Sequence, residues 1–103
     1  METKPAYFIF DVKIHDLAGM KIYGEKVEST YQRYGGKRVV LGGQVIALEG
    51  NAPQGHLVIL QFDSVEQAQA WHDSPEYQEI MPYRHACCDS TVWLAEGVAP
   101  THV

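Results

Sequence analysis

The chain has 103 residues, of which 46% are hydrophobic and 20% charged, and its formal net charge is −5. This length fits one domain, residues 1–103, with enough apolar residues for a core. The acidic balance argues against nucleic acid or an anionic membrane as partner, and no apolar run approaches the ~20 residues that span a bilayer.

Residues 7–14 are predicted to form the first strand, because apolar side chains alternate with a second set that contains both apolar and charged side chains. We expect the apolar side to lie against helices. It consists of Phe8, Phe10, Val12 and Ile14. The other side mixes Tyr7 and Ile9 with Asp11 and Lys13 and could face a partner or a pocket.

From Leu17 the apolar residues recur at steps of three and four, which predicts an amphipathic helix to about Tyr34. Asp16 is the expected N-cap. The helix stripe contains Leu17, Met20, Tyr23, Val27, Tyr31 and Tyr34. Gly35-Gly36 should end the helix, with one glycine in the left-handed conformation.

Residues 39–41 are predicted to begin a second strand, which Gly42 and Gly43 interrupt. A glycine pair there indicates a bulge or the close approach of a backbone or ligand. Residues 44–49 resume an extended pattern, and residues 50–55 are a turn-rich loop. Residues 56–62 are apolar on both faces, as expected for a central strand.

Two helix starts follow in succession. Ser64 with Gln67 forms a capping box, and Ser74-Pro75 is a second start, so one helix should stop near His72 and another begin at Pro75. Pro82 should kink or finish the second helix. Residues 91–96 are predicted as the last strand and 99–103 as a loose tail.

This order of strands and helices predicts an α+β, ferredoxin-like βαββαβ fold. In that fold a four-stranded antiparallel sheet carries its helices on one face. The other face, with Tyr7 and Ile9, is too apolar to be left in water. A homodimer that stacks sheet on sheet would cover it and could enclose a cavity.

Several short motifs resemble those of one family. They are Tyr31 to Lys37, Gly42-Gly43, Leu48-Glu49-Gly50, and Ala70 to Gln78 with Arg84. On these motifs the chain, from about Tyr7 to Gly97, resembles the domain of unknown function 1330 family, part of the dimeric α/β-barrel superfamily. The resemblance implies a homodimer with facing sheets and no known activity. Relatives in the wider superfamily include cofactor-free monooxygenases, haem-degrading enzymes and small-ligand binders.

The chain departs from this family's pattern at four positions. His56 stands where arginine is usual, Gln61 where an acid is common, Asp63 where proline is common, and His72 where tyrosine is usual. If that arginine and acid belong to the family's site, the chemistry of this member differs.

Three polar residues are the catalytic candidates. Asp11 or His15 could act as a base, and Arg84 could hold a carboxylate through two parallel hydrogen bonds. Each has a plainer alternative. Asp11 could form a salt bridge at an edge or interface, His15 could be a solvent-exposed residue before a helix cap, and Arg84 could pair with a surface acid.

Seven further residues are candidates for ligand binding. They are Tyr31, Tyr34, Gly42, Gly43, Trp71, His72 and Tyr77. Tyr31 and Tyr34 share a helix face and could place two hydroxyls in a pocket. A packing role is the alternative for both, and core packing is favoured for Trp71 and Tyr77. For His72 we favour a charge near a helix C-terminus.

No metal-ligand spacing, phosphate loop, nucleophile elbow or dinucleotide fingerprint occurs, so we predict no metal and no cofactor. Cys87 and Cys88 are adjacent, and a bond between them would strain the backbone. Two reduced thiols, together with an N-terminus without a signal peptide, predict a cytoplasmic protein.

Two hypotheses of function remain. The first is a small cofactor-free enzyme, monooxygenase- or isomerase-like, that acts on a small carbonyl or phenolic compound in a pocket between helices and sheet. The second is a non-catalytic dimer that binds a ligand or a protein partner. The spacing of the polar residues does not separate them.

Overall fold

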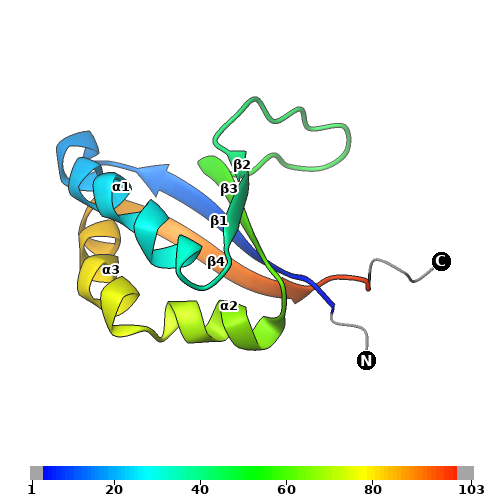
Figure 1. Cartoon of the computed structure of the whole chain (residues 1–103). Coiled ribbons are helices and arrows are strands. Elements are labelled where there is room, and N and C mark those ends of the chain that lie inside the picture. Colours follow the sequence, from blue (N-terminus) through cyan, green and yellow to red (C-terminus); the bar gives the residue numbers. More distant parts are fainter. Residues whose placement is uncertain (1–3, 100–103) are drawn as a thin grey trace.

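The computed structural model of the chain describes residues 4–99, which form one four-stranded sheet and three helices (Figure 1). In chain order the elements are β1 (Ala6–Ile14), α1 (Leu17–Gln32), β2 (Lys37–Leu41), β3 (His56–Phe62), α2 (Val65–His72), α3 (Pro75–Cys87) and β4 (Cys88–Glu96). None of the helices within residues 4–99 has the length and apolar character needed to cross a membrane.

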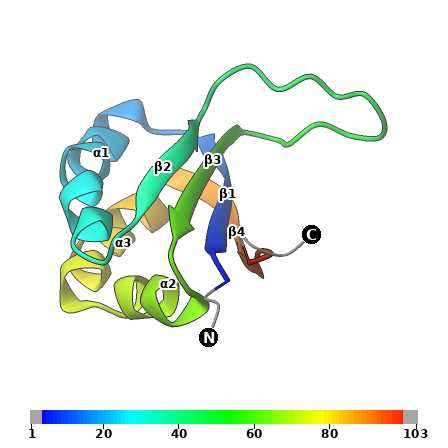
Figure 2. The same ribbon diagram turned by 45° about the vertical axis from the view of Figure 1, so that its right-hand side comes forward.

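The strands are all antiparallel and lie in the order β2-β3-β1-β4, so β1 and β3 are central. Figure 2 shows the strands side by side, with the helices on one side of the sheet. Phe8 on β1 pairs with Leu60 on β3 and Leu94 on β4, and this row faces the helices. The ferredoxin-like α+β fold predicted from the sequence is confirmed.

The core lies between the sheet and the helices and is centred on Trp71 of α2, which is fully buried. Its ring centroid lies 4.1 Å from that of Tyr77, 5.2 Å from that of Phe8 and 5.5 Å from that of Phe62. These rings come from both layers. Aromatic packing between α2, α3, β1 and β3 therefore ties the helices to the sheet.

The predicted helix starts are confirmed by the contacts of three side chains. Asp16 accepts the N–H of Gly19 at 3.1 Å, Ser64 accepts that of Gln67 at 3.1 Å, and Ser74 accepts that of Tyr77 at 3.2 Å. Each bond satisfies a backbone donor that a helix start leaves without a partner.

Helix α1 is shorter than its stripe predicted. It ends at Gln32 rather than near Tyr34, because Gly35 adopts φ +78° and the N–H of Gly36 returns to the carbonyl of Tyr31 at 2.8 Å. This is a left-handed glycine ending. Leu17, which the stripe placed against the sheet, is 77% exposed at the first position of the helix, so its assignment to the packed face was wrong.

Residues 44–49 form no strand, contrary to the prediction. The chain leaves the sheet after Leu41, where the N–H of Gly42 donates to the carbonyl of Leu57 at 2.8 Å, and residues 43–55 project as a long loop (Figures 1 and 2). These residues have an extended pattern but no neighbouring strand with which to pair. The register shift lies earlier, between Arg38 and Val40, rather than at the glycine pair.

The end of the chain also differs from the sequence prediction. Helix α3 continues through Pro82 to Cys87, and β4 begins at Cys88 rather than at Thr91. Proline removes one hydrogen bond on an exposed side of the helix, whereas buried residues beyond it hold the next turns in place. Ala99, predicted to start a loose tail, is buried, and residues 100–103 of that tail lie outside the described part.

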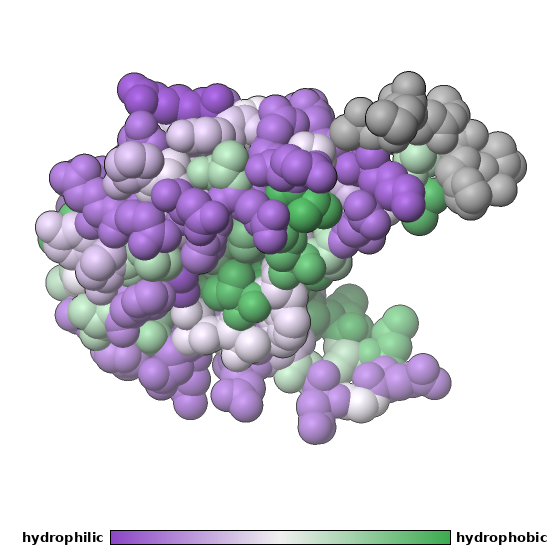
Figure 3. Space-filling view, turned by 90° about the horizontal axis from the view of Figure 1, so that it is seen from below, coloured by the Kyte–Doolittle hydropathy of each residue, from purple (hydrophilic) through white to green (hydrophobic). Residues whose placement is uncertain are grey.

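The second face of the sheet carries no helix. Ile9 lies there between Ile59 and Trp93, and Trp93 is 49% exposed. In Figure 3, hydrophobic residues line a hollow on the side of the molecule away from the helices. An exposed apolar surface of this kind is typical of an interface.

Candidate functional site

A cavity of about 130 Å³ lies between α1 and the face of the sheet that the helices cover. Its walls come from α1, three strands and α3. They are formed by Phe10, Val12, Met20, Tyr23, Gly24, Val27, Tyr31, Arg38, Leu41, Val58, Leu60 and Arg84. Most of these side chains are apolar, so the two arginines and two tyrosines are the groups that can give the cavity its chemistry.

Arg84 is the deepest charged group of the cavity wall, with only 3% of its surface exposed. Its Nη1 donates to the hydroxyl of Ser90, whereas its Nε is buried and has no hydrogen-bond partner within residues 4–99. The guanidinium carbon lies 5.6 Å from the ring centre of Phe10 and 5.9 Å from that of Tyr23. Cation–π contacts therefore replace part of its lost hydration.

No acidic residue balances this buried charge. None of the described residues that line the cavity is Asp or Glu, and no carboxylate within residues 4–99 forms an ion pair with Arg84. The second arginine of the wall, Arg38, pairs with Glu28 at 3.6 Å. The cavity of this acidic chain is thus positively charged, which favours an anionic oxygen inside it.

The hydroxyls of Tyr23 and Tyr77 lie 2.8 Å apart, next to the guanidinium of Arg84. Burial and then the neighbouring Tyr77 hold the pKa of Tyr23 well above its ordinary value. Burial lowers the pKa of Arg84, but the two tyrosines outweigh it and the pKa lies above its ordinary value. At neutral pH this part of the wall therefore contains the Arg84 cation beside the neutral phenol of Tyr23, which can donate a hydrogen bond.

Tyr31 lies farther along α1, and its hydroxyl is buried with no hydrogen-bond partner within residues 4–99. Burial raises the pKa of Tyr31, nearby Arg38 lowers it, and Glu28 raises it again. A buried hydroxyl without a partner costs free energy that a bound polar group could recover.

The two predicted bases lie outside this cavity. Asp11 accepts the N–H of Gln54 at 3.0 Å and that of Gly55 at 2.8 Å, so its carboxylate holds the end of the long loop. His15 is exposed, and its backbone N–H donates to the carbonyl of Cys87 at 2.9 Å. Of the three catalytic candidates, only Arg84 lines the cavity.

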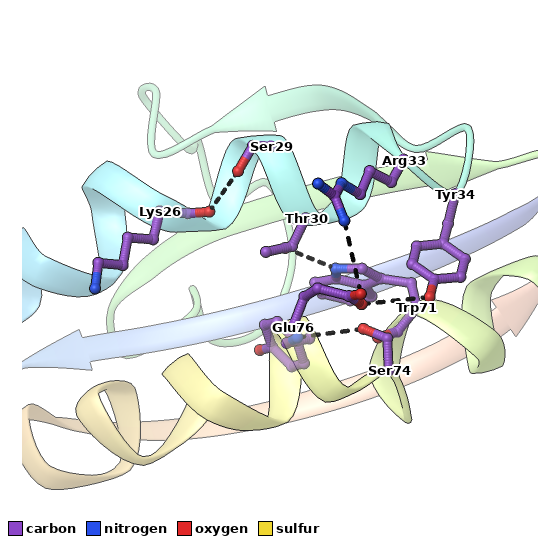
Figure 4. Close-up of polar contacts among 9 residues, drawn as sticks. Lys26, Ser29, Thr30, Arg33, Tyr34, Trp71, Ser74 and Glu76 are labelled. Atoms are coloured by element: carbon purple, nitrogen blue, oxygen red, sulfur yellow. Dashed lines mark hydrogen bonds and ion pairs between the residues drawn. The ribbon is translucent and has the colours of Figure 1, made fainter.

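The predicted ligand-binding residues are also scattered. Tyr31 lines the cavity, whereas the hydroxyl of Tyr34 lies 3.4 Å from a carboxylate oxygen of Glu76, which Arg33 also meets at 3.7 Å (Figure 4). Gly42 and Gly43 lie where the long loop begins and do not line the cavity.

Trp71 and Tyr77 are both fully buried in the core. The indole N–H of Trp71 donates to the hydroxyl of Thr30 at 3.0 Å (Figure 4). The ring of His72 stacks on Phe8 with their centroids 5.7 Å apart, at the C-terminus of α2. Tyr77 reaches the cavity wall through its bond to Tyr23, and the centroid of the Trp71 ring lies 6.4 Å from those of the wall residues Phe10 and Tyr31.

Sequence reasoning missed Tyr23 and Arg38 as site residues. Tyr23 belonged to the helical stripe, whose spacing could have marked it as facing the sheet beside Tyr31. Arg38 gave no signal, because a charged residue near the start of an edge strand usually points to solvent.

No group of three or more His, Cys, Asp or Glu side chains in the described part of the chain could hold a metal ion. Cys87 and Cys88 are both free and buried, with their sulfurs 3.7 Å apart. Burial and then Cys87 raise the pKa of the Cys88 thiol to about 11. This thiol is therefore protonated at neutral pH and is a poor nucleophile.

Comparison with known proteins places the chain in context. A family model described as a domain of unknown function (DUF1330) matches residues 5–98. Among curated proteins, none matches.

Solved structures are similar over nearly the whole chain. RPA0582, a protein of unknown function from Rhodopseudomonas palustris, is similar with a TM-score of 0.76 and 22% identity, over 95% of this chain and 85% of that one. SnoaB, a cofactor-independent oxygenase from Streptomyces nogalater, has a TM-score of 0.62 and 9% identity, over 96% and 97%. HapK from Hahella chejuensis has a TM-score of 0.59 and 12% identity, over 95% and 97%. At these identities the likeness shows the fold alone.

Proposed function

Because the chain belongs to the DUF1330 family, whose description assigns no activity, we propose its function from the cavity beneath α1. The protein binds a small carbonyl or phenolic compound there and acts on it as a cofactor-free enzyme, monooxygenase- or isomerase-like. Arg84 holds the oxygen of that compound, and the Tyr23 hydroxyl is a second donor to it.

The observation that carries this proposal is the buried guanidinium of Arg84 without an acidic partner in residues 4–99. Burying a charge is costly unless something compensates it. A bound oxygen anion would supply the missing charge, and the apolar walls would keep water away and strengthen the attraction.

The described residues of the cavity include no Asp, Glu or His that could act as a base. The proposal therefore favours compounds whose anion a guanidinium can stabilise, such as phenols and 1,3-diketones, with the proton passing to solvent. Arg84 lowers the pKa of such a compound by stabilising its anion. In the monooxygenase reaction this electron-rich anion is the reductant of molecular oxygen, so that one oxygen atom enters the compound and the other leaves as water. SnoaB is an example of this fold in a cofactor-independent oxygenase.

The missing base also supports a second candidate function. A protein that only binds such a compound, without converting it, needs the same cation and the same apolar walls but no acid–base pair. Turnover separates the two candidates, since both predict binding.

We also propose that the protein is a cytoplasmic homodimer. The uncovered sheet face, with half-exposed Trp93 beside Ile9 and Ile59, supports pairing of two copies through their sheets. The free thiols Cys87 and Cys88 support a reducing compartment. Light scattering at micromolar concentration should give twice the 11.6 kDa of one chain, and a mass of one chain would contradict the dimer.

Oxygen uptake tests the enzymatic proposal. Purified protein is mixed with hydroquinones and with 1,3-cyclohexanedione, and the rate is compared with that of Arg84→Met. Arg33→Met is the matched control, because Arg33 is an exposed arginine of the surface pair with Glu76. We expect the rate of Arg84→Met to be at least about tenfold lower than that of the unchanged protein, and the rate of Arg33→Met to be unchanged.

The outcomes are distinct. Equal rates in Arg84→Met and the unchanged protein would refute a catalytic role for this cavity. Binding of the compounds, lost in Arg84→Met, with no oxygen uptake and no product would favour the binding protein over the enzyme.

A further inference from the structure

Only two buried side-chain polar atoms in residues 4–99 lack a hydrogen-bond partner, and both belong to residues that line the same cavity. They are Nε of Arg84 and the hydroxyl of Tyr31. Arg84 is 3% exposed and Tyr31 is 2% exposed, so neither residue is open to bulk solvent. Buried polar atoms without a hydrogen-bond partner are rare. Two of them around one cavity indicate that a ligand supplies the missing partners.

These two residues mark different ends of the cavity. Arg84 lies against the ring of Tyr23, and Tyr31 follows Tyr23 by eight residues on α1. At 1.5 Å of rise per residue, this separation corresponds to about 12 Å along the helix. Arg38, held by Glu28, is a cation at the Tyr31 end.

Apart from the arginines, the tyrosines and Gly24, the wall is apolar. Its apolar side chains are Phe10, Val12, Met20, Val27, Leu41, Val58 and Leu60. The cavity volume of about 130 Å³ is close to the ~150 Å³ of an engineered apolar cavity that admits benzene. A single six-membered ring is therefore the size of ligand core that this cavity suggests.

We propose that the ligand is a small aromatic acid with oxygen groups at opposite ends of its ring, with the carboxylate on Arg84 and the second oxygen on Tyr31. Hydroxybenzoates with the hydroxyl opposite the carboxylate are the simplest members of this class. The inference rests on the proposed function, because it uses the same cavity, and it narrows the ligand from a small carbonyl or phenolic compound to a two-ended aromatic acid.

The charges around the cavity agree with this orientation. A guanidinium offers parallel N–H donors that match a carboxylate, and no acid of the described wall repels one. The Tyr31 end suits a neutral hydroxyl, because the nearby Arg38 is already paired with Glu28 at 3.6 Å.

The test is a set of titrations of the full chain, followed by NMR or calorimetry, with 4-hydroxybenzoate, benzoate and phenol. We expect 4-hydroxybenzoate to bind about tenfold more tightly than benzoate, and benzoate more tightly than phenol. Arg84→Met should weaken both acids by about 10- to 100-fold and phenol by less, because phenol loses one hydrogen bond rather than an ion pair. Tyr31→Phe should weaken 4-hydroxybenzoate by about tenfold and leave benzoate unchanged.

Matched variants control for general effects of each change. Arg33→Met removes an exposed arginine, and Tyr34→Phe removes a hydroxyl of the same helix region that lies outside the cavity, on Glu76. Neither should change any of the three affinities. Each variant is first shown to be folded by its thermal transition, and the acids are titrated into the folded state.

Three results would overturn the inference. Binding of phenol but of neither acid would refute the anionic end and leave the proposed function standing. An equal loss of benzoate and 4-hydroxybenzoate in Tyr31→Phe would refute the second end. Failure of all three compounds to bind at millimolar concentration, with the 1,3-diketone also unbound, would remove the cavity as a site and the proposed function with it.

Discussion

The hydrogen bond between Trp71 and Thr30 gives a sharp test of the core. The indole N–H of the fully buried Trp71 donates to the Thr30 hydroxyl at 3.0 Å, and Thr30 is 7% exposed (Figure 4). Thr30→Val keeps the shape and the helix propensity of the side chain but removes the acceptor. The indole N–H would then be buried without a partner, which costs about 1–3 kcal/mol.

Urea unfolding at one fixed protein concentration measures this cost, since pairing of chains would otherwise shift the midpoint. The matched control is Ser29→Ala, because the Ser29 hydroxyl donates to the carbonyl of Lys26, at 3.2 Å, as the Thr30 hydroxyl donates to that of Val27, but Ser29 is exposed (Figure 4). We expect Ser29→Ala to stay within about 0.5 kcal/mol of the parent. If Thr30→Val is as mild as Ser29→Ala, the indole does not depend on this acceptor and the reasoning is wrong.

Two further predictions concern the cavity, and a third concerns the buried thiol of Cys88. Tyr23→Phe should lower the unfolding free energy by about 1 kcal/mol, because its hydroxyl lies 2.8 Å from that of buried Tyr77; a cycle with Tyr77→Phe should show coupling, and additive losses would refute the pair. Arg84→Met should change the unfolding free energy by less than about 1 kcal/mol, since the cost of burying a guanidinium without an acid in residues 4–99 is offset by its contacts with Ser90, Phe10 and Tyr23; a larger loss would make Arg84 a structural cation instead. Cys88, with its pKa raised from 9.0 to about 11 by burial and then by Cys87, should react with iodoacetamide about 100-fold more slowly at pH 8 than an ordinary thiol. Because the folded state keeps this proton while the unfolded state loses it, stability should fall as pH rises from 9 to 11, and a flat urea midpoint across that range would contradict the shift.

Signals that act over a few residues were predicted well from the sequence. Ser64 and Ser74 start their helices as predicted, and β3 has the predicted bounds of His56–Phe62. The alternation of residues 7–14 separated the two faces of β1 correctly. In each case the cause is local. A cap bonds to a backbone N–H three residues away, and successive side chains of a strand point to opposite faces of the sheet.

Elements that depend on a distant partner were predicted less well. Residues 44–49 have an extended pattern but no strand beside them, whereas β4 gains residues 88–90 because β1 is long enough to pair with them. Pro82 did not end α3 because buried residues beyond it hold the helix. A local pattern cannot report whether a neighbour is present.

The sequence by itself determined the order of elements, the two faces of β1 and the choice of Arg84 as a candidate anion holder. Only the tertiary structure decided that Arg84 is buried without an acid in residues 4–99, that Tyr23 and Tyr31 line the same cavity, and that Asp11 and His15 do not. The physical reason is that backbone caps and side-chain periodicity act within one element. The cost of burying a charge, by contrast, depends on groups brought to it from three other elements of the fold, β1, α1 and β4.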